Sequence, residues 1–219
     1  MQYCEQALAI LGFEPLNAWS NLGFILVAGA GAWYARRSDA AVRRRCTLLI
    51  LLATTLGAGS FAWHATHQAW AELADVLPIL AFVLTFLWQA MRSILGHSRR
   101  AGGLACGAMA SAIIGLGLQW PRALNGSLAY VPVLIALLGL AAVMTTRGLR
   151  RNLWVAALFF TVSLICRSAD LVLCASFPHG THWVWHLLNS GVIFLALKVA
   201  LEGDTAARTY GSSAKAEVP

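Results

Sequence analysis

The chain has 219 residues, of which 59% are hydrophobic and only 11% are charged. Soluble domains carry about 25% charged residues, so the composition excludes an ordinary soluble enzyme and indicates a protein that crosses a membrane several times. The formal net charge of +7 would suit a nucleic-acid-binding protein, but the arginines lie in short segments between apolar runs, so we expect no nucleic-acid partner.

Seven apolar runs are long enough to cross about 30 Å of hydrocarbon, which takes about 20 helical residues. The expected fold class is therefore an all-α integral membrane protein, a seven-transmembrane helix bundle. The expected spans are 16–35, 46–66, 75–95, 101–118, 128–146, 153–175 and 182–201. One helix over 46–95 would be about 75 Å long, so the chain must turn near His67–Leu73. Residues 1–201 form the expected membrane domain, and residues 202–219 a polar cytoplasmic tail that we expect to be disordered.

Basic residues gather in alternate connections between these spans. They lie at 36–45, 92–100 and 147–151 and again after 198, whereas the other connections contain only Arg122. Because cytoplasmic loops are enriched in Lys and Arg, the N-terminus is expected outside and the C-terminus in the cytoplasm. This topology brings the end of the second span and the starts of the third and seventh to the outer side.

Ionisable side chains gather at those outer ends, in otherwise apolar sequence. Ser60 and His64 are four residues apart and share a helix face, as do His182 and His186. Asp75 follows at the start of the third span. Ionisable groups inside membrane spans are costly and usually functional. Three imidazoles suit a catalytic zinc site with an open water position, where Asp75 would act as general base and Ser60 as a hydrogen-bond donor.

Two other interpretations of the three histidines stay open at this point. A zinc ion held in a closed coordination shell would make the chain a non-catalytic receptor or scaffold. A pair of imidazoles could instead ligate haem iron in an electron carrier. Arg167 and Asp170, three residues apart in the sixth span, are expected to form a structural ion pair.

Three segments resemble the signature segments of the alkaline ceramidases: GSFAWHAT at 59–66, ADVLP at 74–78 and HWVWH at 182–186. This family belongs to a superfamily of seven-helix membrane hydrolases that includes the adiponectin receptors. The resemblance implies that His64, His182 and His186 bind zinc and that Asp75 and Ser60 assist catalysis. It also implies hydrolysis of the N-acyl amide of ceramide or a similar lipid, giving a fatty acid and a sphingoid-type amine.

The resemblance has further implications at the N-terminus. The family opens with an acidic segment that helps to bind calcium, and this chain keeps Glu5, Glu14 and Asn17 from it. Calcium takes six to eight oxygen ligands, so calcium binding is doubtful here, and Glu14 and Asn17 are expected to stabilise packing near the outer mouth. The family also links two cysteines that correspond to Cys4 and Cys174, which implies a disulfide.

The Ala-, Arg- and Leu-rich composition indicates a bacterial member of the family. We therefore expect an integral protein of the bacterial inner membrane, with the active site toward the outer side. The sequence leaves the oligomeric state undetermined.

Overall fold

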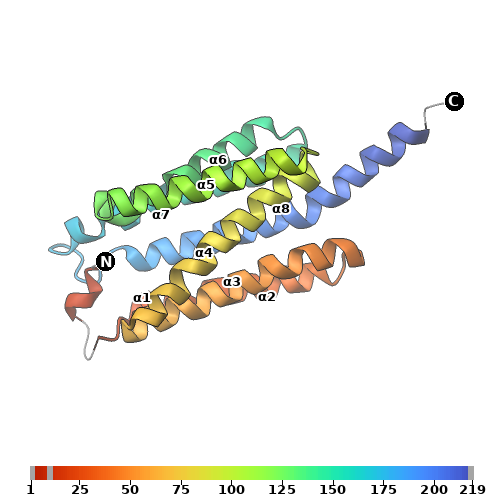
Figure 1. The fold of residues 1–219 in the computed structure, drawn as a ribbon. Coiled ribbons are helices and arrows are strands. Elements are labelled where there is room, and N and C mark those ends of the chain that lie inside the picture. The colour runs from red at the N-terminus through yellow and green to blue at the C-terminus, as the bar shows by residue number, and fades with distance from the viewer. Residues whose placement is uncertain (1–2, 9–11, 217–219) are drawn as a thin grey trace.

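The structure is a computed structural model that describes residues 3–8 and 12–216, with side chains described up to Gly203. In this part of the chain every regular element is a helix, so the all-α fold class is confirmed. The long helices run side by side in one bundle, and the N-terminal segment lies at the same end as the start of the last helix (Figure 1).

The helices follow one another with short connections. The N-terminal part comprises η1 (Glu5–Leu8), α1 (Pro15–Ser20), α2 (Leu22–Ala35), α3 (Ala40–Thr66) and α4 (Ala69–Gln89). The rest comprises the π-helical η2 (Ala90–Ile94), α5 (Arg99–Gln119), η3 (Ala123–Tyr130), α6 (Val131–Val143), α7 (Arg147–Leu173) and α8 (His182–Ala216).

Six helical segments of the described chain are long and apolar enough to cross a membrane, which makes this an integral membrane protein. They correspond to the second to seventh expected spans. The first expected span, 16–35, forms as two consecutive helices, α1 and α2, and the longer has only 14 residues. Which end of the bundle faces the cytoplasm stays a prediction.

Several helices begin earlier than the hydropathy pattern predicted, among them α3, α4 and α7, which start at Ala40, Ala69 and Arg147 rather than at residues 46, 75 and 153. The turn expected near His67–Leu73 is confirmed, but it is short, because only His67 and Gln68 separate α3 from α4. His67 adopts a left-handed backbone conformation, with φ of 51°, and reverses the chain within two residues. Asp75 therefore lies inside α4 rather than at its start. Helix α3 likewise begins at Ala40, because the Asp39 side chain caps it by accepting hydrogen bonds from the N–H groups of Ala41 and Val42.

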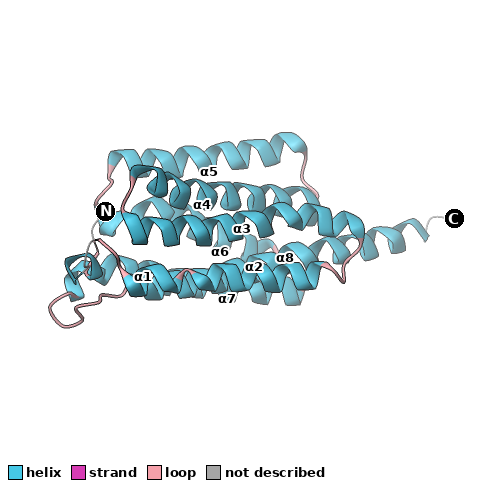
Figure 2. Cartoon of the chain, turned by 90° about the horizontal axis from the view of Figure 1, so that it is seen from below, coloured by secondary structure: helices cyan, strands magenta, loops and turns pink. Residues whose placement is uncertain are grey.

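Helix α8 forms the centre of the bundle. Its apolar stretch is the most buried of the six candidate spans, whereas that of α5 is the least buried. Figure 1 shows α8 between the α2–α3 pair and the group formed by α5, α6 and α7, and Figure 2 shows α5 at the edge of the bundle. Helix α8 contacts α2, α3 and α7, so residues on its inner face can meet side chains from most of the protein.

The α8 helix continues past the expected domain boundary at residue 201 and ends at Ala216. The C-terminal end leaves the bundle in Figure 1. A polar cytoplasmic tail over 202–219 stays a prediction.

Candidate metal centre

Three histidines from opposite ends of the chain meet inside the bundle. His64 lies in the last turn of α3, while His182 and His186 occupy the first two turns of α8. One nitrogen from each ring lies within 4.8 Å of the others, and each residue is only 1% exposed. The i, i+4 spacing on α8 places its two rings on one face, and the close packing of α3 against α8 adds the third.

Hydrogen bonds from the N-terminal segment orient two of these rings. The Nδ1 atom of His64 lies 2.7 Å from Glu14 Oε2, and the Nδ1 atom of His186 lies 2.7 Å from Ser20 Oγ. Ser20 also donates to the carbonyl of Asn17, so its oxygen is left to accept a hydrogen bond from the Nδ1–H group of His186. Burial alone would raise the pKa of Glu14, but His64 and the Asn17 amide together lower it below its ordinary value, which keeps an anion beside His64. Both rings then present Nε2 to the centre of the triad.

The third ring is fixed by backbone contacts and by stacking. The Asp170 carboxylate accepts hydrogen bonds from the N–H groups of Thr181 and His182, at 2.6 and 2.9 Å, and so anchors the beginning of α8. The His182 ring lies between two aromatic rings: Tyr3 stacks on it at 3.7 Å between centroids, and Trp185 is nearly parallel at 5.3 Å. The ring is therefore held in one orientation on both faces.

The donor set fits a divalent metal ion. His182 Nδ1 and His186 Nε2 are buried and have no hydrogen-bond partner within the described residues, and an unsatisfied buried polar atom is costly. An ion at the centre would satisfy both atoms. Three neutral imidazoles are a common ligand set for catalytic zinc, and a carboxylate that holds the second nitrogen of a ligating histidine is a typical outer-shell feature of zinc sites.

The two expected catalytic side chains flank the triad on neighbouring helices. Ser60 lies one turn before His64, and Asp75 faces both residues electrostatically from α4. Ser60 Oγ and Asp75 Oδ1 are both buried, and the Ser60 hydroxyl is a hydrogen-bonding neighbour of the Asp75 carboxylate. Gly59 allows this approach: a Cβ atom there would overlap the carbonyl of Ala74 and would lie 3.0 Å from the Asp75 nitrogen.

The acidic residues considered for calcium are engaged in other contacts. Glu5, 1% exposed, accepts hydrogen bonds of 2.8 Å from the N–H groups of Leu16 and Asn17 and thereby caps α1 from outside the helix. Glu14 holds His64, and its other oxygen lies 2.9 Å from His67 Nε2. These carboxylates thus organise the protein around the histidines, and the structure gives no support to a calcium site.

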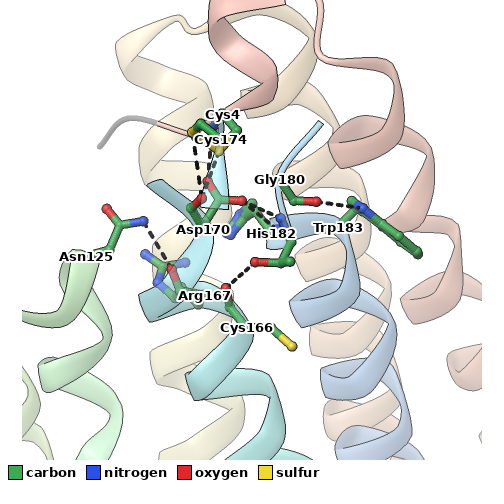
Figure 3. Close-up of a disulfide and its surroundings, with 10 residues drawn as sticks. Cys4, Asn125, Cys166, Arg167, Asp170, Cys174, Gly180, His182 and Trp183 are labelled. Atoms are coloured by element: carbon green, nitrogen blue, oxygen red, sulfur yellow. Dashed lines mark hydrogen bonds between the residues drawn. A yellow bond between two sulfur atoms is a disulfide. The ribbon is translucent and has the colours of Figure 1, made fainter. Parts of the chain in front are cut away.

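A disulfide joins the N-terminal segment to the end of α7. Cys4 and Cys174 are bonded, with their Cα atoms 5.3 Å apart. Figure 3 shows Asp170 beside this disulfide, with its carboxylate directed at Cys4 on one side and at His182 on the other. Gly180 has a positive φ of 63°, and a Cβ atom there would overlap the Asp170 carboxylate. The disulfide and Asp170 together place Tyr3 over the triad.

A buried cation lies close to the same site. The Arg167 guanidinium carbon is 4.9 Å from the centroid of the Trp185 ring and 5.5 and 5.8 Å from those of Tyr130 and Tyr3. Asp170, expected as its ion-pair partner, directs its carboxylate at the backbone N–H groups described above. Arg167 is a cation–π partner of residues that border the triad, and its ion pair with Asp170 stays a prediction.

A largely apolar cavity lies beside the triad inside the bundle. Its wall includes Phe24 and Trp185, whose rings also contact His186. Along α8 the lining continues through Asn189 to Ala196, a helical distance of about 15 Å from His186. Its shape and composition suit a hydrocarbon chain whose polar end lies at the histidines.

Sequence reasoning missed four residues that support the centre. The sequence predicts neither the contact of Ser20 with His186 nor that of Glu14 with His64. Tyr3 was passed over, and Asp170 was expected to pair with Arg167 rather than to anchor α8. Position alone could have indicated Asp170, because a carboxylate in a membrane span is costly unless it has specific partners.

Comparison with known proteins completes the description of the chain. The family model described as Ceramidase matches residues 1–204, which include every residue of the centre. No curated protein matches the chain at a significant level.

Proposed function

The chain belongs to the Ceramidase family, and on that premise we propose that it is a zinc-dependent membrane amidase. Membership implies a hydrolase that acts on amide bonds of a lipid such as ceramide. The proposal adds the zinc ion, its ligands His64, His182 and His186, and the roles of Asp75 and Ser60. Cleavage of the N-acyl bond would release a free fatty acid and a sphingoid-type amine.

One observation carries the proposal. Buried nitrogens of His182 and His186, which have no hydrogen-bond partner among the described residues, converge with His64 on one point, and the buried carboxylate of Asp75 and hydroxyl of Ser60 flank them. A closed structural zinc site needs no carboxylate and hydroxyl beside its ligands. Their presence beside the triad favours a hydrolase over a receptor or scaffold.

In the proposed amide hydrolysis the metal ion and the side chains have different roles. A bound zinc ion would supply Lewis acidity and lower the pKa of the attacking water. Asp75 accepts a proton from this water as its oxygen bonds to the acyl carbon. Ser60 donates a hydrogen bond to the oxyanion that develops on the carbonyl oxygen. Asp75 then returns the proton to the amide nitrogen as the carbon–nitrogen bond breaks, so that the amine leaves neutral.

The proposed location of the site is the outer side of the bacterial inner membrane. The Cys4–Cys174 disulfide lies at the same end of the bundle as the triad, and disulfides persist in oxidising compartments such as the bacterial periplasm. The distribution of arginines favours the same orientation. A cysteine-accessibility experiment that compares the two sides of the membrane would test this orientation.

Fatty-acid release from ceramide in detergent tests the function. The purified protein should contain about one zinc per chain, lose its activity with a chelator and regain it with added zinc. His64→Ala and Asp75→Asn should abolish release while the protein still elutes as a monodisperse species. Full turnover by either variant, or haem absorbance in place of zinc, would overturn the proposal.

A further inference from the structure

The cavity next to the triad is lined by an asparagine side chain whose hydrogen-bonding capacity is incomplete. Among the described residues that line it, Tyr130, Trp185 and Asn189 are the ones with side-chain hydrogen-bonding groups, and the others are apolar. Asn189 is 8% exposed. An amide at this depth in an apolar cavity requires partners for both of its ends.

The orientation of the Asn189 amide follows from its neighbours. Its nitrogen lies 2.8 Å from the carbonyl oxygen of Trp185 and 3.3 Å from Ser163 Oγ. A carbonyl only accepts hydrogen bonds, and Ser163 uses its own hydrogen to bond the carbonyl of Phe160 at 2.8 Å. Both acceptors therefore require the amide NH₂ group. The assignment of nitrogen and oxygen is thus determined by chemistry.

The remaining group, Asn189 Oδ1, is an acceptor. It has no hydrogen-bond partner in the part of the chain that the structure describes, and its residue lines the cavity. The indole Nε1 of Trp185, four residues earlier on α8, is a buried donor that also has no hydrogen-bond partner there. Trp185 and Asn189 thus offer a donor and an acceptor in one apolar cavity. A hydroxyl group on a substrate chain satisfies both, because it donates one hydrogen bond and accepts others.

The position of Asn189 indicates where that hydroxyl would be on the substrate. Asn189 follows His186 by three residues, which is about 4.5 Å farther along α8. A chain whose carbonyl lies at the triad would bring its first few carbons to this depth. The hydroxyl that Asn189 would bind therefore belongs to the acyl chain, because the amine lies on the other side of the scissile bond.

We infer that Asn189 recognises a hydroxyl on the second or third carbon of the acyl chain, so that the enzyme prefers amides of hydroxylated long-chain acids. This inference rests on the proposed function, which places the scissile carbonyl at the triad. Asn189 is accordingly a specificity residue, and Ser163 positions its amide from α7.

The test compares amides of the same amine and chain length that carry a 2-hydroxyacyl, a 3-hydroxyacyl or an unsubstituted acyl chain. The wild-type protein should hydrolyse one of the hydroxylated substrates with about tenfold higher kcat/KM, the effect of one buried neutral hydrogen bond. Asn189→Leu should bring this ratio close to one, and Ser163→Ala should lower it partly. Ser168→Ala, on a separate surface groove of α7, should leave the ratio unchanged.

Thermal stabilisation by the free acids gives a readout that does not require turnover. The hydroxylated acid should raise Tm more than the plain acid, and Asn189→Leu should remove the difference. The inference would be overturned if the wild-type protein showed equal kcat/KM for hydroxylated and plain substrates and equal Tm shifts with the two acids. It would also be overturned if Asn189→Leu kept the preference for the hydroxylated substrate. Neither result would contradict the proposed amidase activity. Absence of hydrolysis of every amide would instead refute the proposed function, and the Tm comparison would still decide the role of Asn189. If Asn189→Leu does not fold, the wild-type values and Ser163→Ala decide it.

Discussion

Glu14 and His64 form a buried carboxylate–imidazole pair, 2.7 Å apart, that joins the N-terminal segment to the end of α3. The backbone strengthens this junction, because the Glu14 N–H donates to the His64 carbonyl. The segment before the first long helix is therefore part of the candidate metal centre, and four changes to the surrounding contacts test how the centre is held.

Glu14→Gln should weaken zinc binding about 10- to 100-fold, because the neutral amide is a poorer acceptor for the His64 N–H and makes the ring a weaker ligand. Competition with a chelator of known affinity measures this change. Glu202→Gln, at an exposed position far along α8, is the control. Unaltered affinity in Glu14→Gln would show that the pair does not tune the centre.

Gly59→Ala should displace α4, since the added methyl group overlaps the Ala74 backbone. We expect a loss of about 1–3 kcal/mol in stability from overpacking and up to about a 100-fold loss in kcat from the shift of Asp75. Gly103→Ala provides a matched control, because that helical glycine has nothing within 4 Å of its added Cβ. Equal stability and equal kcat in Gly59→Ala and Gly103→Ala would argue against a close crossing of α3 and α4.

Asp170→Asn should destabilise the protein by about 1.5–3 kcal/mol for each hydrogen bond lost, because one side of the amide cannot accept the N–H groups of Cys4 or of Thr181 and His182. Zinc affinity should fall as well, since the start of α8 loses its anchor. Melting curves and metal titration report the two effects. Loss of stability with wild-type zinc affinity would restrict Asp170 to a structural role.

Removal of the disulfide in Cys4→Ala/Cys174→Ala should lower the free energy of unfolding by about 2–4 kcal/mol and should reduce zinc affinity, because Tyr3 is no longer held over His182. Thiol titration of the unfolded wild-type protein should give three reactive groups before reduction and five after it. Cys106→Ala should change neither stability nor affinity much. Five free thiols without a reductant would refute the bond.

The sequence predicted the long spans and the three histidines well, since apolar length and i, i+4 spacing are local properties. It misplaced the starts of α3 and α4, because an Asp cap and a left-handed histidine determine these boundaries rather than hydropathy. The partners of Glu14, Ser20 and Asp170 lie far away in the chain: Asp170 is 166 residues from Cys4. Such pairings depend on which helices become neighbours, and no local pattern encodes that.

The separation of the three imidazoles along the chain has a consequence for biogenesis. The first enters the lipid with α3, but the other two arrive only when α8, the last helix, leaves the insertion machinery. A polypeptide that stops before α8 therefore cannot assemble the centre, and the surrounding bilayer meets a competent hydrolase only after α8 has been inserted.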